Sequence, residues 1–473
     1  MNTKSIFSLT AAALLAASLH ATTPGWQADV DKMIANGDFA KAELLMKKLP
    51  RDERMAQAVR IDSLNTIMKR IRADFSLTPE QGVAKIKERM PEATNAQIEN
   101  WKKTKKLEVM TIDGKEMWFH KSVRNLWLLA DEFATSNMAD QQETTAERVN
   151  DFRVAMAADC DARGVRFWNK VQVTFTLDVD ADVVPAGEVI RAWLPFPMEN
   201  KRQRNIKFIS SNLPATFSDG SIHHTVYMEA VAQKGKPTHF EQTFSYEVGE
   251  WHIAKQDMLV LLKPYDTNSQ LYKRYTMSEP RHMIIDADIT AKAREIVGNE
   301  TNPIEQASLL LKWIGTNFPW AGAREYSTIA NIPNYVLNSG HGDCGQVTLL
   351  YITMCRSLGI PARWESGYMV QPNFNDFHDW CETYFEGIGW VPTDPSFIRG
   401  SVGTVIEDYY MSGLDVYRMA SNEGVGGELS PAKQYIRTET VDFQEGEVEW
   451  KGGNIYNNKF SSHFTVNSFT PCK

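Results

Sequence analysis

The chain has 473 residues, of which 43% are hydrophobic and 23% are charged, the balance of a globular protein rather than of a disordered one. Its 51 Lys and Arg residues and 59 Asp and Glu residues give a net charge of −8, which disfavours nucleic acid or an anionic membrane as a partner. Five cysteines are too few for a disulfide scaffold, and the length predicts about three domains.

The chain begins with the features of a targeting segment. Lys4 precedes an apolar run from Ile6 to Leu19, and small residues follow up to Ala21. This layout is typical of a secretory signal peptide, so we predict that residues 1–21 are a signal peptide and that the protein is exported to the periplasm or the extracellular space. Later apolar runs are much shorter than the roughly 18 residues that a membrane span needs. We expect the best of them, Met258 to Leu262, to be a buried strand, and we expect no membrane span.

Two regions of different periodicity follow. Residues 22–163 have a mainly helical pattern with one predicted β-hairpin, whose turn is Asp113-Gly114. From residue 164 to residue 263 the period changes to two, because apolar and polar residues alternate from Val171 to Leu177. Short strands that are broken at regular intervals by turn residues are typical of a β-sandwich. We therefore predict a mainly helical N-terminal domain followed by a β-sandwich domain.

Helices return in the second half of the chain. Asn302 is a good N-cap, Pro303 suits the first helical position, and Glu305 is placed to complete a capping box. A second helix is predicted to begin at Cys344, because the apolar residues from Val347 to Leu358 fall on one helical face. The N-terminus of a helix carries partial positive charge and free N–H groups, and both favour a thiolate over a thiol. A cysteine at this position can therefore become a nucleophile.

A nucleophilic cysteine needs a base, and only two of the ten histidines, His378 and His463, follow Cys344 in the chain. His378 begins a strand-like run, which a turn at Glu386 connects to a second strand-like run that leads to Asp394. His378 and Asp394 each lie eight residues from Glu386, so a hairpin centred there brings them close together. A carboxylate beside an imidazole fixes its tautomer and stabilises the imidazolium, which is the third role in a Cys-His-Asp site.

Several short motifs in this region resemble one known family. They are Gly342-Asp343-Cys344-Gly345, Gly359-Ile360-Pro361-Ala362-Arg363, Gly367-Tyr368, His378-Asp379-Trp380 and Gly389-Trp390-Val391-Pro392-Thr393-Asp394-Pro395. Together they look like the transglutaminase-like core of the papain-like cysteine superfamily, over about residues 280–400. The earlier segment from Trp193 to Pro197 is similar to the β-rich domain that often precedes this core in bacterial members. One departure is Cys381, which stands where the family commonly has a polar residue.

The resemblance implies an exported enzyme of the bacterial type, with an α+β multidomain fold and a papain-like, transglutaminase-like catalytic core at 264–423. It implies Cys344 as the nucleophile, His378 as general base and acid, and Asp394 as the orienting carboxylate. The implied chemistry is acyl transfer, in which Cys344 attacks an amide carbonyl and forms a thioester while His378 protonates the leaving amine. Trp320 lies where the family often places an aromatic donor to the oxyanion, and a packing role is the alternative for this side chain.

Three functions remain open at this stage. We favour a hydrolase that cleaves amide bonds in a peptide or protein substrate, with cell-envelope peptides as one class. A protein-crosslinking transglutaminase would use the same residues, so the motifs do not separate the two. A non-catalytic protein that uses the fold as a binding scaffold is the third alternative, because a fold does not dictate a function. We expect no cofactor and no metal ion.

The tail at 424–473 is predicted to be β-rich and to pack on the catalytic core. Its Gly424–Gly427 segment is interpreted as a flexible linker, and the stretches 435–443 and 447–450 are predicted strands. Cys160 and Cys472 either pair or stay free, and the odd number of cysteines fits at least one free thiol.

Overall fold

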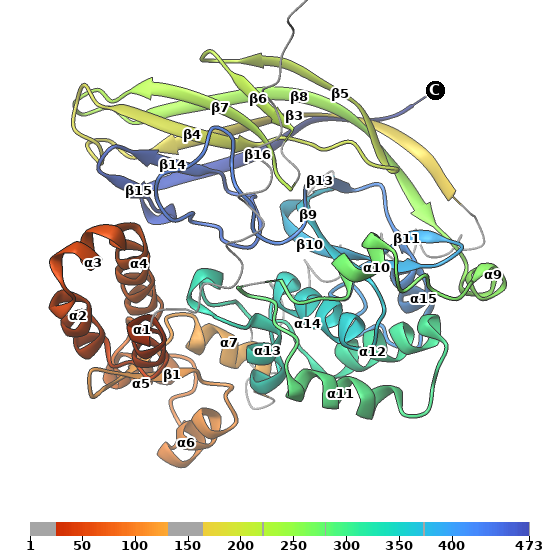
Figure 1. The fold of residues 1–473 in the computed structure, drawn as a ribbon, viewed down its shortest axis with the longest axis horizontal. Helices are drawn as coiled ribbons and strands as arrows, with labels where there is room; N and C mark the ends of the chain where they lie inside the picture. Colours follow the sequence, from red (N-terminus) through yellow and green to blue (C-terminus); the bar gives the residue numbers. More distant parts are fainter. Residues whose placement is uncertain (1–24, 131–163, 220–221, 280, 372–373, 473) are drawn as a thin grey trace, which may run out of the picture.

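The computed structural model describes residues 25–130, 164–219, 222–279, 281–371 and 374–472. The predicted signal peptide and Cys160 lie outside the described residues. Figure 1 shows two long sheets across the top, the N-terminal helices below them on the left, and further helices with a smaller sheet below them on the right. The predicted mixture of helices and sheets is therefore confirmed as an α+β fold. The domain boundaries stay predictions.

The N-terminal region consists of helices and one hairpin. Its helices are α1 (Gly25–Ala35), α2 (Phe39–Lys48), α3 (Arg51–Ala56), α4 (Ala58–Asp74), α5 (Pro79–Lys87), α6 (Asn95–Lys103) and α7 (Ser122–Leu129). The hairpin pairs β1 (Val109–Ile112) with β2 (Lys115–Trp118). Its turn is the predicted Asp113-Gly114, and both residues have positive φ, which this dipeptide tolerates. Two apolar clusters form the interior of the region, one around Phe39 and one around Trp101.

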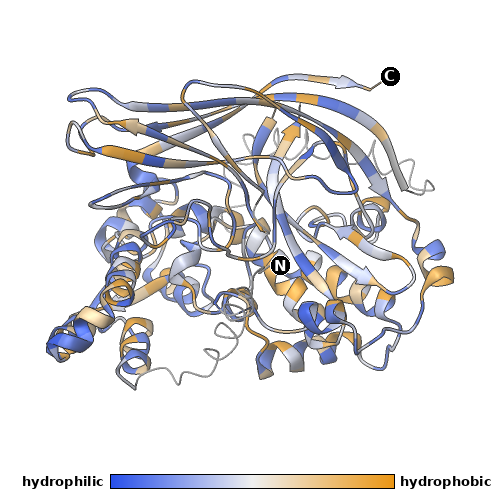
Figure 2. Cartoon of the chain, turned by 45° about the horizontal axis from the view of Figure 1, so that its top comes forward, coloured by the Kyte–Doolittle hydropathy of each residue, from blue (hydrophilic) through white to orange (hydrophobic). Residues whose placement is uncertain are grey.

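Two antiparallel sheets form the sandwich. Their strands are β3 (Gly164–Val179), β4 (Val189–Pro195), β5 (Gln203–Ser211), β6 (Thr216–Asp219), β7 (His224–Val231), β8 (Thr238–His252), β12 (Gly413–Leu414), β14 (Glu447–Trp450), β15 (Gly453–Ile455) and β16 (Phe460–Pro471). One sheet has the order β12-β8-β3-β16, with β5 also on β8, and the other has the order β15-β14-β4-β7-β6. The alternation predicted along β3 is present, because Val171 and its apolar partners up to Leu177 are buried. Figure 2 shows the same alternation of hydrophobic and hydrophilic residues along the long strands.

The C-terminal strands complete this sandwich, and the segment that precedes them contacts Trp364 and Asp379 of the predicted catalytic core through Gly424 and Gln444. Strand β16 pairs along β3 from Phe460, which lies opposite Val179, to Pro471, and β14 pairs with β4. The predicted strand at 447–450 is confirmed as β14. No strand forms at 435–443 in the described chain, because backbone groups of this stretch bond buried carboxylates instead of a neighbouring strand. The strands of the tail thus cover edges of β3 and β4 that would otherwise be open.

The remaining elements surround one central helix. They are α9 (Lys255–Leu261), α10 (Gln270–Tyr275), α11 (Ala287–Val297), α12 (Pro303–Asn317), the 3-10 turn η2 (Tyr326–Thr328), α13 (Ile332–Ser339), α14 (Cys344–Ser357), β9 (Ala362–Gln371), β10 (Phe374–Phe385), β11 (Gly389–Thr393), α15 (Val405–Met411) and β13 (Arg418–Glu423). Another 3-10 turn, η3 (Asn457–Lys459), precedes β16. The smaller sheet has the order β11-β10-β9-β13, and α14 contacts β9 and β10. The helix predicted to begin at Cys344 is confirmed.

Two local predictions in this part need correction. Asn302 caps α12 as expected, but Glu305 forms an ion pair with Lys255 at 2.6 Å instead of closing a capping box. The run from Met258 to Leu262 was predicted as a buried strand, yet it lies mostly in helix α9. Met258 is buried and Leu261 and Leu262 pack against the same core, whereas Val260 is 84% exposed. A run of five apolar residues does not distinguish a strand from an amphipathic helical turn.

The smaller sheet lies between helix α14 and the sandwich. Tyr368 and Val370 of β9, with Met419 of β13, belong to the apolar interior of the sandwich. The ring of Tyr368 stacks on Phe464 of β16, with ring centroids 4.1 Å apart. The other face of the sheet packs on α14 through Trp364 and its neighbours. This arrangement holds β10 and the start of α14 in fixed relative positions.

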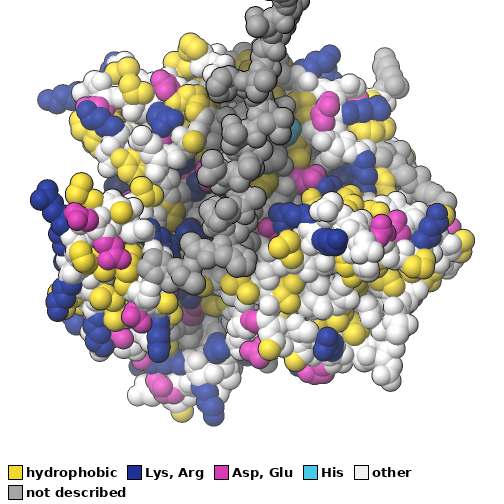
Figure 3. Space-filling model, viewed as in Figure 1, with side chains coloured by type: hydrophobic (Ala, Val, Ile, Leu, Met, Phe, Trp, Pro, Cys, Tyr) yellow, Lys and Arg dark blue, Asp and Glu magenta, His cyan; other side chains and the backbone are white. Residues whose placement is uncertain are grey.

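The surface of the molecule has mixed charge. Figure 3 shows Lys and Arg side chains interspersed with Asp and Glu over the visible face. None of the helices within the described ranges is long and apolar enough to cross a membrane.

Candidate active site

Cys344 is the first residue of α14, and a capping box holds the turn in front of it. The Asp343 side chain accepts the backbone N–H of Gln346 at 2.9 Å, and the Gln346 side chain accepts the backbone N–H of Asp343. The Tyr326 hydroxyl donates to the same Asp343 carboxylate at 2.6 Å. The N-terminus of α14 is therefore fixed from two sides, and it carries Cys344 in a half-buried position.

The thiol of Cys344 donates a hydrogen bond to Oδ2 of Asp379, at a distance of 3.5 Å. Gly345 allows this approach, since a Cβ atom there would lie 2.5 Å from Asp379 Oδ2 and 2.4 Å from the Tyr326 hydroxyl. Within the described ranges, no hydrogen bond joins Cys344 to the ring of His378. The structure thus places the sulfur against the residue that follows His378 in β10.

The electrostatic prediction for Cys344 is wrong for this arrangement. Burial raises the pKa of the Cys344 thiol well above its ordinary value, and the carboxylates of Asp379 and Asp343 raise it further. Both effects oppose the partial positive charge at the start of α14. The resting form of Cys344 is therefore the neutral thiol and not the thiolate.

Asp379 is itself an unusual buried carboxyl group. Its Oδ1 accepts the Nε2–H of Gln444 at 2.9 Å, and the same amide nitrogen donates to the backbone oxygens of Gly367 and His378. Burial raises the pKa of Asp379 well above its ordinary value, and the nearby acidic groups Asp442 and Asp343 add to the shift. Cys344 and Asp379 are therefore a buried pair in which each group holds its proton more tightly than it would in water, because the pKa of each is raised.

The structure brings His378 and Asp394 together. Strands β10 and β11 pair with Cys381 opposite Thr393, which places Asp394 just beyond the end of β11 and beside the first half of β10. His378 Nε2 lies 2.8 Å from Asp394 Oδ2. Burial lowers the pKa of His378 below 6.5, although Asp394 opposes this shift.

Asp394 remains ionised although it is completely buried. Burial would raise its pKa, but His378 and the guanidinium of Arg418 hold it well below the usual range. The second oxygen, Oδ1, accepts the backbone N–H groups of Ser396 and Phe397 and the hydroxyl of Ser396. Asp394 is thus fixed by donors on both oxygens, which orients it toward His378.

The backbone of Trp320, the predicted oxyanion donor, lies beside the turn that precedes Cys344, but its side chain is partly exposed to solvent. Its backbone forms a parallel bridge with Gly342, and the N–H of Ala321 donates to the oxygen of Gly342 at 3.2 Å. The Trp320 side chain is 40% exposed. Its role toward an oxyanion stays a prediction.

Two arginines of the site are not part of the sequence prediction. Arg399 donates through Nη2 to the backbone oxygens of Gly342 and Asp343, both at 3.0 Å, and burial lowers its pKa to about 10. Arg418 contacts Asp394 from β13 at 2.9 Å. Arg399 lies five residues after Asp394, so its proximity in the chain was a usable signal. Arg418 lies far from the motifs, and no local pattern marks it.

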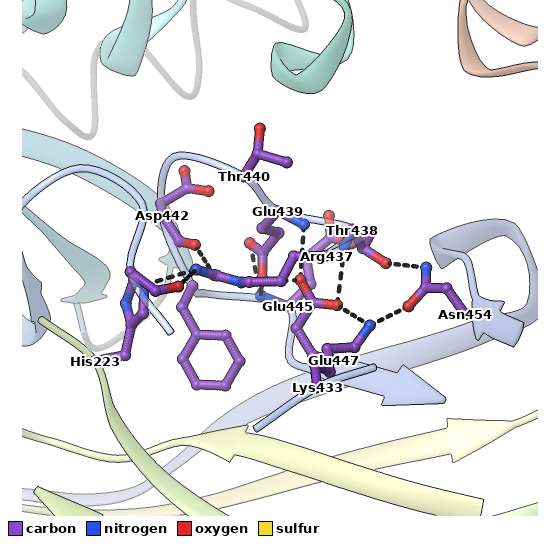
Figure 4. A network of polar contacts seen from close by, with 12 residues as sticks. His223, Lys433, Arg437, Thr438, Glu439, Thr440, Asp442, Glu445, Glu447 and Asn454 are labelled. Carbon is purple, nitrogen blue, oxygen red and sulfur yellow. Dashed lines mark hydrogen bonds and ion pairs between the residues drawn. The ribbon is translucent and has the colours of Figure 1, made fainter. Parts of the chain in front are cut away.

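Gln444 reaches the site from a loop that the sequence predicted to begin as a flexible linker. The N–H of Gly424 instead donates to the oxygen of Trp364, and the N–H of Gly426 donates to the oxygen of Val441. Figure 4 shows the interior of this loop, in which Arg437 and Glu447 bind several backbone and side-chain groups. The loop is therefore an ordered support for Gln444.

The other described cysteines lie outside the proposed triad and form no disulfide bonds. Cys381 is buried and donates to the oxygen of Thr393 at 3.4 Å, and burial raises its pKa well above the ordinary value. Cys344, Cys355, Cys381 and Cys472 are all free thiols. Among the described residues, no three His, Cys, Asp or Glu side chains are arranged to hold a metal ion.

Residues 290–395 match the family model of the transglutaminase-like superfamily. An uncharacterized protein, YebA of Bacillus subtilis (strain 168), is 23% identical over 146 residues, which cover 26% of this chain. The match spans only 20% of that relative's own length. The resemblance noted from the sequence motifs is therefore confirmed for this segment, which is a transglutaminase-like domain.

Two solved structures are also similar. A candidate cysteine protease from Cytophaga hutchinsonii has 16% identity and a TM-score of 0.45, covering 66% of this chain and 92% of its own. The periplasmic domain of TgpA from Pseudomonas aeruginosa has 14% identity and a TM-score of 0.26, covering 54% of this chain and 95% of its own. Both scores lie below 0.5, so the assignment of the domain depends on the match at 290–395.

Proposed function

We propose that this transglutaminase-like domain is an amide-cleaving cysteine hydrolase, in which Cys344 is the nucleophile, His378 the base and Asp394 the orienting carboxylate. The observation that carries the proposal is the 2.8 Å contact between His378 Nε2 and the buried carboxylate of Asp394. This contact uses one ring nitrogen as a donor and leaves Nδ1 as the proton acceptor. The depressed pKa of His378 keeps the ring neutral near pH 7, as a base must be.

The reaction begins with the thiol in its neutral form. The Cys344 side chain turns away from Asp379, its proton passes to Nδ1 of His378, and the sulfur attacks the carbonyl carbon of an amide. A tetrahedral intermediate forms, and His378 returns the proton to the nitrogen of the leaving amine as the C–N bond breaks. A thioester remains on Cys344. Water then attacks it with His378 as the base, which releases an acid and restores the thiol.

The negative oxygen of each tetrahedral intermediate needs hydrogen-bond donors. The backbone N–H of Cys344 is one candidate, because the first N–H groups of a helix have no partner within the helix. Trp320 is the second candidate, and its place beside Gly342 puts it near the turn that carries Cys344.

We further propose that the substrate is a peptide or protein, with cell-envelope peptides as one class, and that the chain is exported. The apolar run near the N-terminus supports export.

The test is a search for the thioester. The full chain is incubated with peptides and cell-envelope fragments, stopped with acid and analysed by mass spectrometry for an acyl group on Cys344. We expect a Cys344 adduct and an acid product, both lost in Cys344→Ala. Cys381→Ala is the matched control, since it removes a buried thiol from the same sheet without touching the proposed triad.

The same assay with a glutamine donor and a labelled primary amine separates the alternatives. If the labelled amine is incorporated and no acid product forms, the proposal of a hydrolase is replaced by that of a protein-crosslinking transglutaminase. Tight binding of a peptide without any adduct, unchanged in Cys344→Ala, would overturn the enzyme proposal and favour a binding scaffold.

A further inference from the structure

His378 is one of two cationic or potentially cationic groups that contact Oδ2 of Asp394. His378 Nε2 lies 2.8 Å from this oxygen and Arg418 Nη2 lies 2.9 Å from it. The other oxygen of Asp394 is occupied by Ser396 and Phe397. Arg418 therefore contacts the same carboxylate oxygen that orients His378 in the proposed mechanism.

Arg418 is held in place by contacts that do not involve His378. It is only 1% exposed and lies on β13, where it pairs with Met369 of β9. Its Nη2 also lies 3.2 Å from Oδ2 of Asp415, and Nε lies 3.3 Å from the same atom. The hydroxyl of Tyr410 donates to that oxygen at 2.9 Å. The guanidinium is thus fixed between two carboxylates.

Aromatic rings surround the guanidinium of Arg418 and shield it from solvent. Its guanidinium carbon lies 4.2 Å from the ring centroid of Phe397 and 5.4 Å from that of Trp380. The ring of His378 packs on the same two aromatic side chains. Charges interact more strongly in such surroundings than in water, so the position of Arg418 matters for the charge of His378.

The groups that set the charge of His378 come from several elements. They are Asp394 after β11, Arg418 on β13, Asp415 between β12 and β13, and Asp376 on β10 itself. Arg399, in the loop that follows Asp394, acts on Asp394 and on Cys344, and Asp379 is the partner of Cys344. Tyr410 acts on this set through its bond to Asp415. Among them Arg418 is the cation in direct contact with the carboxylate that His378 uses.

We propose that Arg418 is a positioning residue of the site, which shares Asp394 with His378 and so keeps the imidazole neutral until it receives the proton of Cys344. This proposal rests on the proposed function, since it assigns a part in the same proton transfer. Because the permanent positive charge of Arg418 contacts the shared oxygen, it weakens the electrostatic stabilisation that Asp394 gives to the protonated form of His378. The same effect makes the imidazolium, once formed, a stronger acid toward the leaving amine.

Arg418 and Asp415 have opposite charges, so their removal has opposite effects on His378. Arg418 lowers the pKa of His378, and Asp415 raises it. A purely structural role of this buried pair would not produce shifts of opposite sign. The two variants therefore separate charge from packing.

The test measures the charge of His378 directly and needs no substrate. The full chain is labelled with ¹³C-histidine, the His378 signal is assigned by its absence in His378→Gln, and its shift is followed from pH 4.5 to 8.5 by NMR. In Arg418→Met we expect the midpoint to rise by about one pH unit, a roughly tenfold gain in proton affinity. In Arg418→Lys, which keeps the charge, we expect a midpoint near that of the wild type. In Asp415→Asn we expect it to fall.

Arg356→Met is the matched control for loss of a buried ion pair. Arg356 is 4% exposed and pairs with Glu279 at 3.1 Å near the far end of α14. We expect no shift of the His378 midpoint in this variant. Equal shifts in Arg418→Lys and Arg418→Met, or no shift in a folded Arg418→Met, would overturn the proposal.

The wild-type titration keeps the proposal testable if Arg418→Met does not fold. A wild-type midpoint above about pH 7 would contradict it, because the imidazole would then be mostly charged at neutral pH. Failure of the proposed function would appear differently, as a missing acyl group on Cys344 with the His378 midpoint and its response to Arg418 unchanged. The two results are therefore distinguishable.

Discussion

The thiol of Cys344 donates its hydrogen bond to Asp379, the residue next to the proposed base, at 3.5 Å. Burial and this carboxyl group both raise the pKa of the thiol. The sulfur is therefore held as a neutral thiol, and the nucleophilic attack proposed above requires that its proton first leave this pair.

Replacing Asp379 should make Cys344 more reactive toward simple alkylating reagents. In Asp379→Asn the amide keeps the shape of the side chain and cannot become negatively charged when Cys344 ionises, so the pKa of Cys344 falls. We expect iodoacetamide to modify Cys344 about tenfold faster at pH 7, measured by mass spectrometry over time. Asp376→Asn, on the same strand, is the control. Equal rates in the wild type and Asp379→Asn would show that Asp379 does not raise the pKa of the thiol.

Adding a methyl group at Gly345 should disturb the same pair. The new Cβ would lie 2.5 Å from Asp379 Oδ2 and 3.0 Å from the Trp364 ring, so these groups must move. We expect Gly345→Ala to lower the free energy of unfolding by about 1–3 kcal/mol. Denaturant unfolding measures this loss. Gly25→Ala, where a Cβ meets no neighbour, should change stability by less than about 1 kcal/mol.

Arg70 connects the N-terminal helices to the rest of the molecule. It is 4% exposed and donates to Ser327 Oγ at 2.8 Å and to the oxygen of Arg437 at 2.9 Å. Removing it leaves these acceptors unpaired in a buried contact. We expect Arg70→Met to lose about 2–4 kcal/mol of unfolding free energy.

The same helix provides a control for this prediction. Arg72 pairs with Asp113 at 2.8 Å, but its side chain is 44% exposed. Because exposed ion pairs contribute little, Arg72→Met should lose less than about 1 kcal/mol. If both variants unfold at the same denaturant concentration, the contacts of Arg70 do not stabilise the junction.

Asp74 makes the same junction sensitive to pH. It accepts the N–H of Glu325 at 3.0 Å, and burial raises its pKa from 3.8 to about 7. Between these two values the unfolded chain releases a proton that the folded chain keeps, so the stability of the wild type falls as pH rises from 4 to 7. Asp74→Asn keeps an acceptor oxygen and cannot ionise. Its stability relative to the wild type should therefore increase by up to about 4 kcal/mol over this range.

Thermal unfolding at pH 4, 6 and 8 measures this difference. Asp62→Asn, an exposed acid on the same helix α4, should show a constant difference from the wild type at all three values. A constant difference for Asp74→Asn as well would contradict the assigned pKa.

The sequence predicts those parts of the site that lie in short contiguous motifs. The start of α14, the β10–β11 hairpin and the turn at Asp113-Gly114 each depend on local spacing, and the structure contains all three. The side-chain partners of Cys344 could not be derived in this way. Asp379 lies within a quoted motif, but a one-residue difference in position along a strand decides which face it occupies.

The long-range supports of the site have no local pattern. Arg418, Gln444 and Arg70 are single polar residues in ordinary surroundings, and their roles arise only from contacts with residues dozens to hundreds of positions away. The tail strands were recognisable as strands in part, but their pairing with β3 and β4 depends on open sheet edges. Such edges are a property of the folded molecule and not of one segment.

Pairing of β16 with β3 joins the last part of the chain to residues made almost three hundred positions earlier. During synthesis, β3 leaves the ribosome long before its neighbour exists, and Gln444 follows Cys344 by a hundred residues. In the growing polypeptide, the edge of β3 therefore stays open until β16 is made, and the surroundings of Cys344 lack Gln444 until that residue is made. The surroundings of Cys344 are therefore complete only after the chain has been made as far as Gln444 and β16.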